Sequence, residues 1–346
     1  MAETYANTFE ALTLALTPKV LVDNIFSERP TLKYLRRRMK PVSGKVYQPL
    51  VEYDKLTGGF YARGGTLTNS VSGDIATRAE FSLKYYQMPV LLYAQDVDLQ
   101  GSLGLVDLMQ AYIRNAIKSS TSELNGYVFT GNPSASPAQM DSLNVAVDDT
   151  ATWGLDPATR SEWKAHIMES TDGVSPSKEN IGYMITKIME TCAERPDLVI
   201  VDPDYWQSLY AQLDSGIQYT AQAHASNPVV KWGFDTFFIK GVPVVSDSDC
   251  QGETFVSGQG TRANAKGYQA YFLNFRHLEL VYNAKRAWKW DPAGWRRPET
   301  LDAYMNRWFC WMTLAGDMRR SLGRIYNVDL TQDLADFELG TVVAPS

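Results

Sequence analysis

The sequence is poor in the residues that most metal sites and nucleophile sites need. It has three histidines and three cysteines among 346 residues, and none of them stands in an H-E-x-x-H or C-x-x-C spacing. The G-x-S-x-G turn of a nucleophilic serine and the G-x-x-x-x-G-K-[ST] phosphate loop are also missing. These absences exclude a zincin and give no support to a serine hydrolase or a P-loop nucleotidase. The cysteines are widely separated and odd in number, so we expect three reduced thiols.

Positive charge and long apolar runs are scarce as well. Lys and Arg total 33 against 39 Asp and Glu, which gives a net charge of −6. A protein that grips DNA through its phosphates usually has the opposite balance. The longest apolar runs, such as residues 89–94, are too short to span a bilayer. No basic residue precedes Lys19, which is wrong for a signal peptide, so we expect a soluble protein made in the cytoplasm.

Two acidic pairs are the remaining candidates for metal chemistry. Asp202 with Asp204, and Asp247 with Asp249, are spaced so that both carboxylates of a pair can converge on a cation. The first pair follows a buried-type strand and precedes Pro203, which is typical of a helix N-cap. The second pair lies in a Ser-Asp-Ser-Asp turn, where turn chemistry accounts for the same residues. Gly258 and Gly260 lack the third glycine of a dinucleotide fingerprint.

What the sequence does have is a long two-stranded ribbon. Residues 45–53 and 79–90 each alternate apolar and polar side chains, which predicts two strands, and a glycine-rich stretch with great backbone freedom separates them. A two-stranded ribbon is barely stable alone in water, so its apolar side chains need a partner. Because no local core is expected there, we assign its aromatic residues to contacts between subunits. These are Tyr47, Tyr53, Phe60, Tyr61, Phe81, Tyr85 and Tyr86.

The concentrated positive charge of the chain lies in residues 32–40. Arg36, Arg37 and Arg38 are its centre. We interpret this segment as a solvated face or a face paired with a neighbouring subunit, with nucleic-acid contact as the alternative. The residues before it carry only short apolar clusters, which indicates an arm that packs against something else.

A long helix is predicted over residues 104–130, where apolar residues recur at three- and four-residue steps. It would be about 38 Å long at 1.5 Å per residue, and Pro133 prevents its continuation. Residues 134–177 are read as irregular. Further helices are predicted at 180–193 and 203–213, with Trp206, Leu209, Tyr210 and Leu213 packed on a sheet. Strands are predicted at 198–201, 236–239, 242–245, 271–274 and 278–282, and long strands within 304–328. This mixture predicts an α+β fold.

The order of these parts resembles the major capsid protein family of tailed bacteriophages, the Hong Kong 97-like fold that encapsulins also use. The long helix ending at residues 123–131, the strand and helix at 197–209, and the segment Gly241–Ser246 carry the resemblance, which covers most of the chain. It implies a non-enzymatic subunit without cofactor or metal. Such a subunit self-assembles as hexamers and pentamers into an icosahedral shell around double-stranded DNA.

The resemblance also implies a division of the chain and a set of partners. The expected parts are an N-terminal arm (1–44), an E-loop hairpin (45–92), a P-domain with its spine helix (93–178), an A-domain (179–290), a P-domain strand return (291–332) and an acidic tail (333–346). Expected partners are identical subunits, a separate scaffolding protein because only about 44 residues precede the hairpin, a portal, a decoration protein as a further candidate, and non-specifically contacted DNA, with no membrane.

The expected location is the virion, assembled in the cytoplasm of a bacterial host. Nothing marks Lys55 or another lysine as a crosslinking partner, so we expect non-covalent stabilisation. Two alternatives stay open. One is an encapsulin-like nanocompartment, and the other, more remote, is a metal-dependent hydrolase using Asp247 and Asp249.

Overall fold

The computed structural model describes residues 29–53, 60–61, 63–65, 75–95, 108–169, 174–212, 236–250, 267–330 and 341–343. Several predictions fall outside the described residues. They are the arm up to residue 28, Lys55 and most of the glycine-rich tip, the helix start at 104–107, Leu213, the Gly258 and Gly260 pair, and the tail at 331–340 and 344–346.

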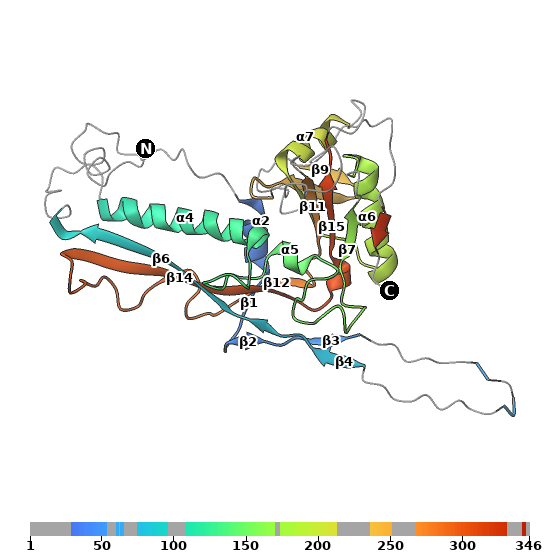
Figure 1. Cartoon of the computed structure of the whole chain (residues 1–346), viewed down its shortest axis with the longest axis horizontal. Coiled ribbons are helices and arrows are strands. Elements are labelled where there is room, and N and C mark those ends of the chain that lie inside the picture. The colour runs from blue at the N-terminus through green and yellow to red at the C-terminus, as the bar shows by residue number, and fades with distance from the viewer. Residues whose placement is uncertain are drawn as a thin grey trace.

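A five-stranded sheet forms the elongated part of the molecule (Figure 1). Its longest strand is β14 (Ala303–Gly316), which pairs antiparallel with β6 (Lys84–Tyr93) over ten residue pairs. β12 (Leu278–Tyr282) and β13 (Lys289–Trp290) also pair with β14, and β1 (Met39–Pro41) runs parallel to β12. The prediction that long strands within residues 304–328 return to an earlier layer is confirmed, because β14 joins β6, which lies at residues 84–93.

Helix α4 (Leu108–Thr130) lies along this sheet, as Figure 1 shows. It confirms the predicted long helix and its end before Pro133, where the Gly131 N–H donates to the Tyr127 carbonyl at 2.9 Å. At the end far from the second sheet the core is thin. A small hydrophobic cluster there has Val90, Leu92 and Ala116 as its buried members. Among the described residues, no helix is both long and apolar enough to cross a membrane.

A seven-stranded mixed sheet forms the second body, with strand order β16-β7-β15-β11-β8-β10-β9. Its strands are β7 (His166–Glu169), β8 (Leu198–Val201), β9 (Thr236–Ile239), β10 (Val242–Ser246), β11 (Tyr268–Leu273), β15 (Gly323–Val328) and β16 (Thr341–Val343). Helices α6 (Lys178–Cys192) and α7 (Pro203–Ala211) accompany it. β8 is buried at all four positions, as its continuous apolar run predicts.

The N-cap prediction for α7 is confirmed, since the Asp202 side chain accepts the Asp204 N–H at 3.0 Å. The predicted buried face of this helix is partly wrong. Leu209 is buried and Trp206 is partly buried, but Tyr210 is 51% exposed and stacks on Trp206. Tyr205, which the pattern did not single out, is fully buried in its place.

The ribbon is shorter than the two predicted strands. Residues 45–53 form β2 (Val46–Tyr47) and β3 (Leu50–Glu52), separated at Pro49, which has no N–H to give to a ladder. β2 pairs with β5 (Phe81–Ser82), and β3 pairs with β4 (Ala76–Arg78). Beyond Leu83 the second strand leaves the ribbon and becomes β6. The ribbon therefore comprises residues 46–52 and 76–82, and the rest of the predicted strand belongs to the five-stranded sheet.

Two more segments differ from the expectation. Residues 134–177 are not wholly irregular, because they contain α5 (Leu143–Ala146) and β7. Part of the expected acidic tail, β16, pairs antiparallel with β7 at the edge of the seven-stranded sheet. Neither segment has the length or the alternation from which a single sequence reveals an element. β7 is parallel to β15, a pairing between residues more than 150 positions apart.

A buried arginine forms hydrogen bonds with the backbone of residues 145–151, which include the end of α5. Arg319, in the short 3-10 turn η4 (Arg319–Ser321), is 1% exposed. Its guanidinium donates to the carbonyls of Val145, Ala146 and Ala151 at 2.7–2.9 Å. These carbonyls satisfy a charged group that would otherwise be costly to bury.

Candidate assembly surfaces and the junction between the sheets

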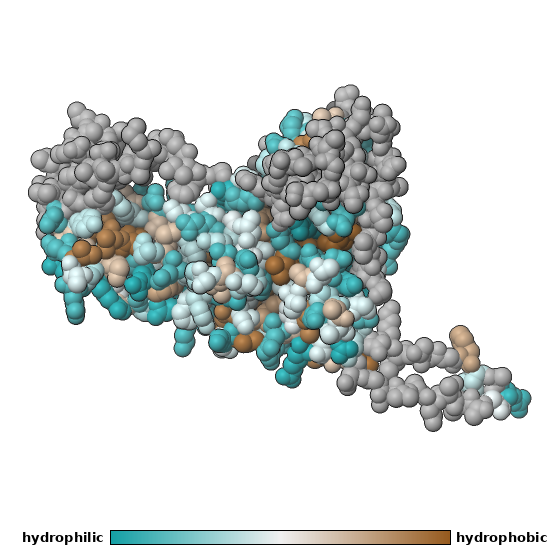
Figure 2. Space-filling model, viewed as in Figure 1, coloured by the Kyte–Doolittle hydropathy of each residue, from teal (hydrophilic) through white to brown (hydrophobic). Residues whose placement is uncertain are grey.

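The ribbon presents apolar side chains that the described part of the chain does not cover. Leu50 on β3 is 63% exposed, and Phe60, Tyr61 and Ile75 are also exposed. The described residues 60–61 and 63–65 lie far from both sheets, at the right of Figures 1 and 2. We call Leu50, Phe60, Tyr61 and Ile75 the ribbon surface.

Phe81 does not belong to this surface, which corrects the assignment of all ribbon aromatics to subunit contacts. It is 1% exposed, and its ring lies edge-on to Trp153 with 5.1 Å between centroids. Gly154 makes room for it, since a Cβ there would lie 2.5 Å from the Phe81 ring. The base of the ribbon thus has a local core, formed with a segment too distant in sequence for the alternation pattern to reveal.

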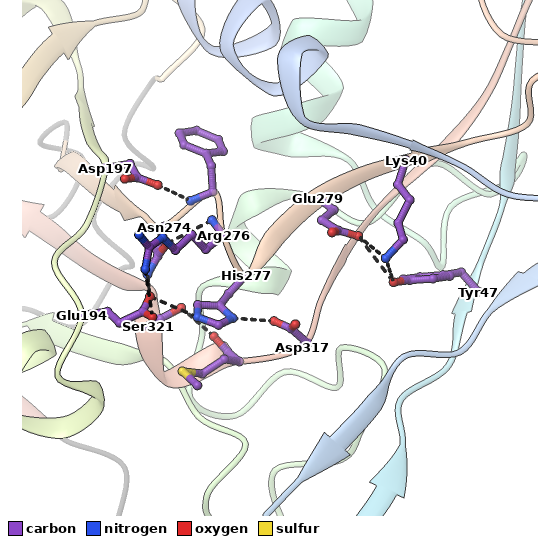
Figure 3. A network of polar contacts seen from close by, with 12 residues as sticks. Lys40, Tyr47, Glu194, Asp197, Asn274, Arg276, His277, Glu279, Asp317 and Ser321 are labelled. Carbon is purple, nitrogen blue, oxygen red and sulfur yellow. Dashed lines mark hydrogen bonds and ion pairs between the residues drawn. The ribbon is translucent and has the colours of Figure 1, made fainter. Parts of the chain in front are cut away.

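Three of the tyrosines make contacts within the chain. Tyr47 accepts from Lys40 Nζ at 2.8 Å, next to Glu279 (Figure 3). Tyr53 lies under the Arg160 guanidinium, 4.0 Å from its ring centroid. Tyr86 donates to Glu123 of α4 at 2.8 Å, and burial together with this hydrogen bond raises the pKa of its phenol.

Tyr85 points to the other face of the five-stranded sheet. Residues opposite each other in an antiparallel register share a face. The face that carries Val90 and Leu92 packs with α4, so Tyr85 lies on the face away from the helix. Tyr85 is 57% exposed and contacts Trp311 with 4.8 Å between ring centroids. By register, this side also carries Leu91, Met305, Phe309 and Trp311, and with Tyr85 we call it the outer face.

The basic segment is a 3-10 turn, η1 (Arg36–Arg38), between α2 (Pro30–Leu35) and β1. All three arginines are exposed. Arg36 stacks on Trp288, 4.7 Å from the ring centroid. Among the described residues, no carboxylate lies within ion-pair distance of Arg36 or Arg38. We call these three residues the basic turn.

In the second acidic pair, Asp247 and Asp249 both accept hydrogen bonds from other residues of the same chain. Asp247 is buried and accepts from the Thr31 N–H and hydroxyl at 3.2 and 2.6 Å, and from the Asn125 amide at 3.1 Å. It also accepts the Asp249 N–H at 3.0 Å, the turn bond that the sequence predicts. Asp249 pairs with Arg29 at 3.0 Å. Burial raises the pKa of Asp247, although the hydrogen bonds from Thr31 oppose this shift.

These contacts form the first of two polar nodes between the sheets. The asparagine node consists of Thr31, Asn125 and Asp247. Asn125 lies on α4, its Oδ1 accepts the Leu32 N–H of α2 at 3.0 Å, and its amide donates to the turn after β10. It therefore ties two elements of the five-stranded body to the seven-stranded sheet. Among the described residues, no cluster of three or more His, Cys, Asp and Glu side chains is placed to hold a metal ion.

The second node, which we call the histidine node, consists of Glu194, His277 and Asp317 (Figure 3). His277 Nδ1 lies 2.7 Å from Asp317 Oδ1, and Nε2 lies 3.1 Å from Glu194 Oε2. The hydrogen bond to Asp317 is the largest cause that raises the pKa of His277, and partial burial opposes it. The sequence does not reveal either node, because the members of each lie 40 or more residues apart and form no local motif.

No protein-family model and no curated protein sequence matches the chain. Solved structures do match. The capsid asymmetric unit of cyanophage A-1(L) has a TM-score of 0.69 at 17% identity, over 92% of this chain and 99% of that one. The capsid of a native GTA particle has a TM-score of 0.58 at 8% identity, over 91% and 96%. The SrpI encapsulin of Synechococcus elongatus PCC 7942 has 0.55 at 12%, over 96% and 98%.

The chain therefore has the Hong Kong 97-like fold of phage capsid proteins, as the order of its sequence elements indicates. At these identities the likeness concerns the fold, and function rests on the surfaces that this chain presents.

Proposed function

We propose that this protein is the major capsid subunit of a tailed phage, which assembles as hexamers and pentamers into an icosahedral shell around double-stranded DNA. The observation that carries the proposal is the match to the cyanophage capsid chain, which extends over nearly the whole length of both chains. Assembled in the cytoplasm of a bacterial host, the protein would reside in the virion and catalyse no reaction.

The ribbon surface supports self-association. Leu50 lies on β3 and Ile75 directly precedes β4, whereas Phe60 and Tyr61 lie between these two strands and belong to no strand themselves. Full burial of one such side chain contributes about 1.5–3 kcal/mol. Covering Leu50, Phe60, Tyr61 and Ile75 on a neighbour would therefore contribute several kcal/mol per subunit, before the cost of ordering them.

The outer face of β6 and β14 is the surface that we assign to the neighbouring ribbon. It is the sheet face opposite α4, where apolar and aromatic side chains stand beside the exposed Gln87 and Arg307, and Tyr85 and Trp311 form a ring pair on it. Arg286 lies over Phe309 and Trp311, at 4.8 and 5.8 Å from their ring centroids, and adds a cation to a surface rich in aromatic rings. Aromatic and arginine side chains are enriched at the centres of protein interfaces.

The basic turn is assigned to an ion-paired contact with a neighbouring subunit. Arg36 and Arg38 have no ion-pair partner among the described residues, whereas Glu52 and Glu80 of the ribbon are exposed. A ribbon that crosses a neighbour would bring acidic side chains to these arginines. Nucleic-acid contact by the same turn is the competing assignment, and the net charge of −6 weighs against it.

Imaging the purified full-length protein by negative-stain electron microscopy, with and without a co-expressed scaffolding protein, tests the proposal. We expect closed shells of uniform diameter. Leu50→Ser should reduce the yield of shells. Leu301→Ser, at an exposed leucine outside the named surfaces, is the matched control and should leave the yield unchanged. A compact, protease-resistant monomer with the ribbon folded onto its own body would contradict the proposal.

An encapsulin-like compartment is the second candidate, and the match to the SrpI encapsulin favours it. The content of particles isolated from the native source separates the two functions. Double-stranded DNA supports the capsid, and an enclosed protein cargo supports the compartment. The portal, scaffolding and decoration proteins are further proposals that depend on the first outcome.

A further inference from the structure

The chain passes directly between the two sheets at two short segments that lie side by side. One leads from β11 to β12 through residues 274–277, and the other from β14 to β15 through residues 317–322. The Asp317 N–H donates to the His277 carbonyl at 3.3 Å, so the two passages touch through their backbones. Gly316 is part of this close approach, because a Cβ there would lie 2.7 Å from the His277 carbonyl oxygen.

The imidazole of His277, in the first passage, contacts side chains from two further segments. Asp317 belongs to the second passage, and Glu194 follows the end of α6 on the seven-stranded side, as Figure 3 shows. Glu194 also accepts from the Asn274 amide at 2.9 Å and lies 3.5 Å from Arg276. The Asp197 carboxylate holds the first passage through the Phe275 N–H at 2.9 Å.

Solvent reaches the histidine node but not the asparagine node. The side chain of His277 is 16% exposed and that of Asp317 is 50% exposed. Thr31, Asn125 and Asp247 are buried. A proton can therefore enter or leave the histidine node without unfolding of the junction, whereas the asparagine node keeps its contacts.

The number of ring protons decides how many carboxylates His277 can hold. An imidazolium donates from both nitrogens, and a neutral imidazole donates from one and presents a lone pair at the other. Because both of its neighbours are carboxylates, the neutral ring satisfies one of them and faces the other with a lone pair.

We propose that His277 is a proton-controlled clamp on the junction, which holds both passages and the end of α6 when protonated and releases one carboxylate when neutral. The asparagine node serves as the fixed point about which the junction loosens. The clamp belongs to the subunit itself. Its consequence, that the angle between the two bodies within a shell responds to pH, rests on the proposed function.

The direction of the pH response follows from the charges around the ring. The carboxylates raise the pKa of His277, so its stabilising contribution is complete below the pKa of an unfolded histidine, about 6.5, and is lost as the pH rises through the folded value. Glu194 has a lowered pKa, chiefly because of the Asn274 hydrogen bond, and stays ionised in this range. The cationic side chains on these elements are those of Arg195, Arg276 and Arg320.

Histidine-selective isotope labelling gives a direct test on the full-length chain. The sequence has three histidines, so three ring signals are expected, and single substitutions to glutamine assign them. We expect His277 to titrate above 6.5. His166, which burial holds at a pKa of about 4, is the internal control that stays neutral. A His277 signal that titrates at or below the ordinary value would overturn the proposal.

Hydrogen exchange reports the junction itself. Exchange of peptides covering residues 274–277 and 317–322 is compared at pH 6 and pH 8.5, after correction for the intrinsic pH dependence of exchange. Losing one such hydrogen bond should speed exchange about 3- to 10-fold at the higher pH. His277→Gln should remove this difference, and persistence of the difference in that variant would overturn the clamp. A chain that forms no shells yet shows the pH-dependent exchange would refute the proposed function and leave the clamp intact.

Discussion

The Asn125 amide donates to the Asp247 carboxylate at 3.1 Å, although the two residues are 122 positions apart. The same asparagine accepts the Leu32 N–H with its oxygen, so both ends of one side chain are used. Through this contact α4 is joined to the turn after β10, and the long helix of one sheet becomes attached to the other sheet. A carboxylate that looks like a metal ligand in the sequence is thus a structural anchor.

Removing this anchor should strongly destabilise the fold. Asp247→Ala removes the acceptor of the buried Thr31 N–H and hydroxyl and leaves the Asn125 amide with Asp249 as its remaining acceptor, and we expect a loss of about 3 kcal/mol in the free energy of unfolding. Asp249→Ala is the matched control and should lose less, because Asp249 is partly exposed. Urea denaturation of the unassembled chain measures both. Equal losses in the two variants would contradict the role of Asp247.

Arg319 offers a second test of a buried polar anchor. Arg319→Met keeps the length and much of the volume but removes the donors to Val145, Ala146 and Ala151. Because the lost bonds satisfied one buried and two partly buried carbonyls, we expect the free energy of unfolding to fall by about 2–4 kcal/mol.

The near-ultraviolet circular dichroism of this variant should change as well, since Arg319 lies over Trp153. Arg320→Met is the control at the neighbouring position, which is less buried. If both variants kept wild-type stability, the hydrogen bonds from Arg319 to the three carbonyls would not contribute to the stability of the fold.

The parts of the fold that the sequence predicts correctly are those with a local cause. The periodicity of α4 and the capping sequence around Asp202 each act within a few residues, and both are confirmed. The burial of Phe81 was missed because it depends on Trp153, a partner far along the chain. The edge strand β16 has three residues, too few to show a period.

The same distinction applies to the candidate surfaces. Exposed aromatics on a glycine-linked ribbon can be recognised from composition, and Phe60 and Tyr61 are indeed exposed. The outer face could not be predicted, because it needs the register of β6 against β14. The histidine node is likewise invisible, since Glu194, His277 and Asp317 meet only when two sheets are joined.

His166 makes the free energy of unfolding of the chain depend on pH in the acidic range. Burial lowers its pKa to about 4, whereas in the unfolded chain it titrates near 6.5. Between these values the unfolded state binds more protons, so stability falls as the pH falls. This contribution amounts to up to about 3 kcal/mol between pH 7 and pH 4.

His166→Gln should therefore flatten the dependence of the unfolding free energy on pH between 4 and 7, whatever it does to stability at neutral pH. Urea denaturation at several pH values measures the slope. His277→Gln is the informative comparison, because its raised pKa makes an opposite contribution, lost as the pH rises. An unchanged slope in the His166 variant would contradict this prediction, because it would mean that the imidazole binds its proton equally well in the folded and the unfolded chain.

Reversing the charge of the basic turn tests the proposed contact between subunits. Arg36, Arg37 and Arg38 are exposed, so changing all three to Glu should leave the unfolding free energy of the single chain within about 1 kcal/mol. If they pair with acids of a neighbouring copy, like charges would then face each other, and shells should not form.

Wild-type assembly should also weaken as salt screens the contact. Arg114→Glu, at an exposed position on α4, is the control that should still assemble. Intact shells from the triple variant that bind DNA less tightly would instead assign the turn to nucleic acid.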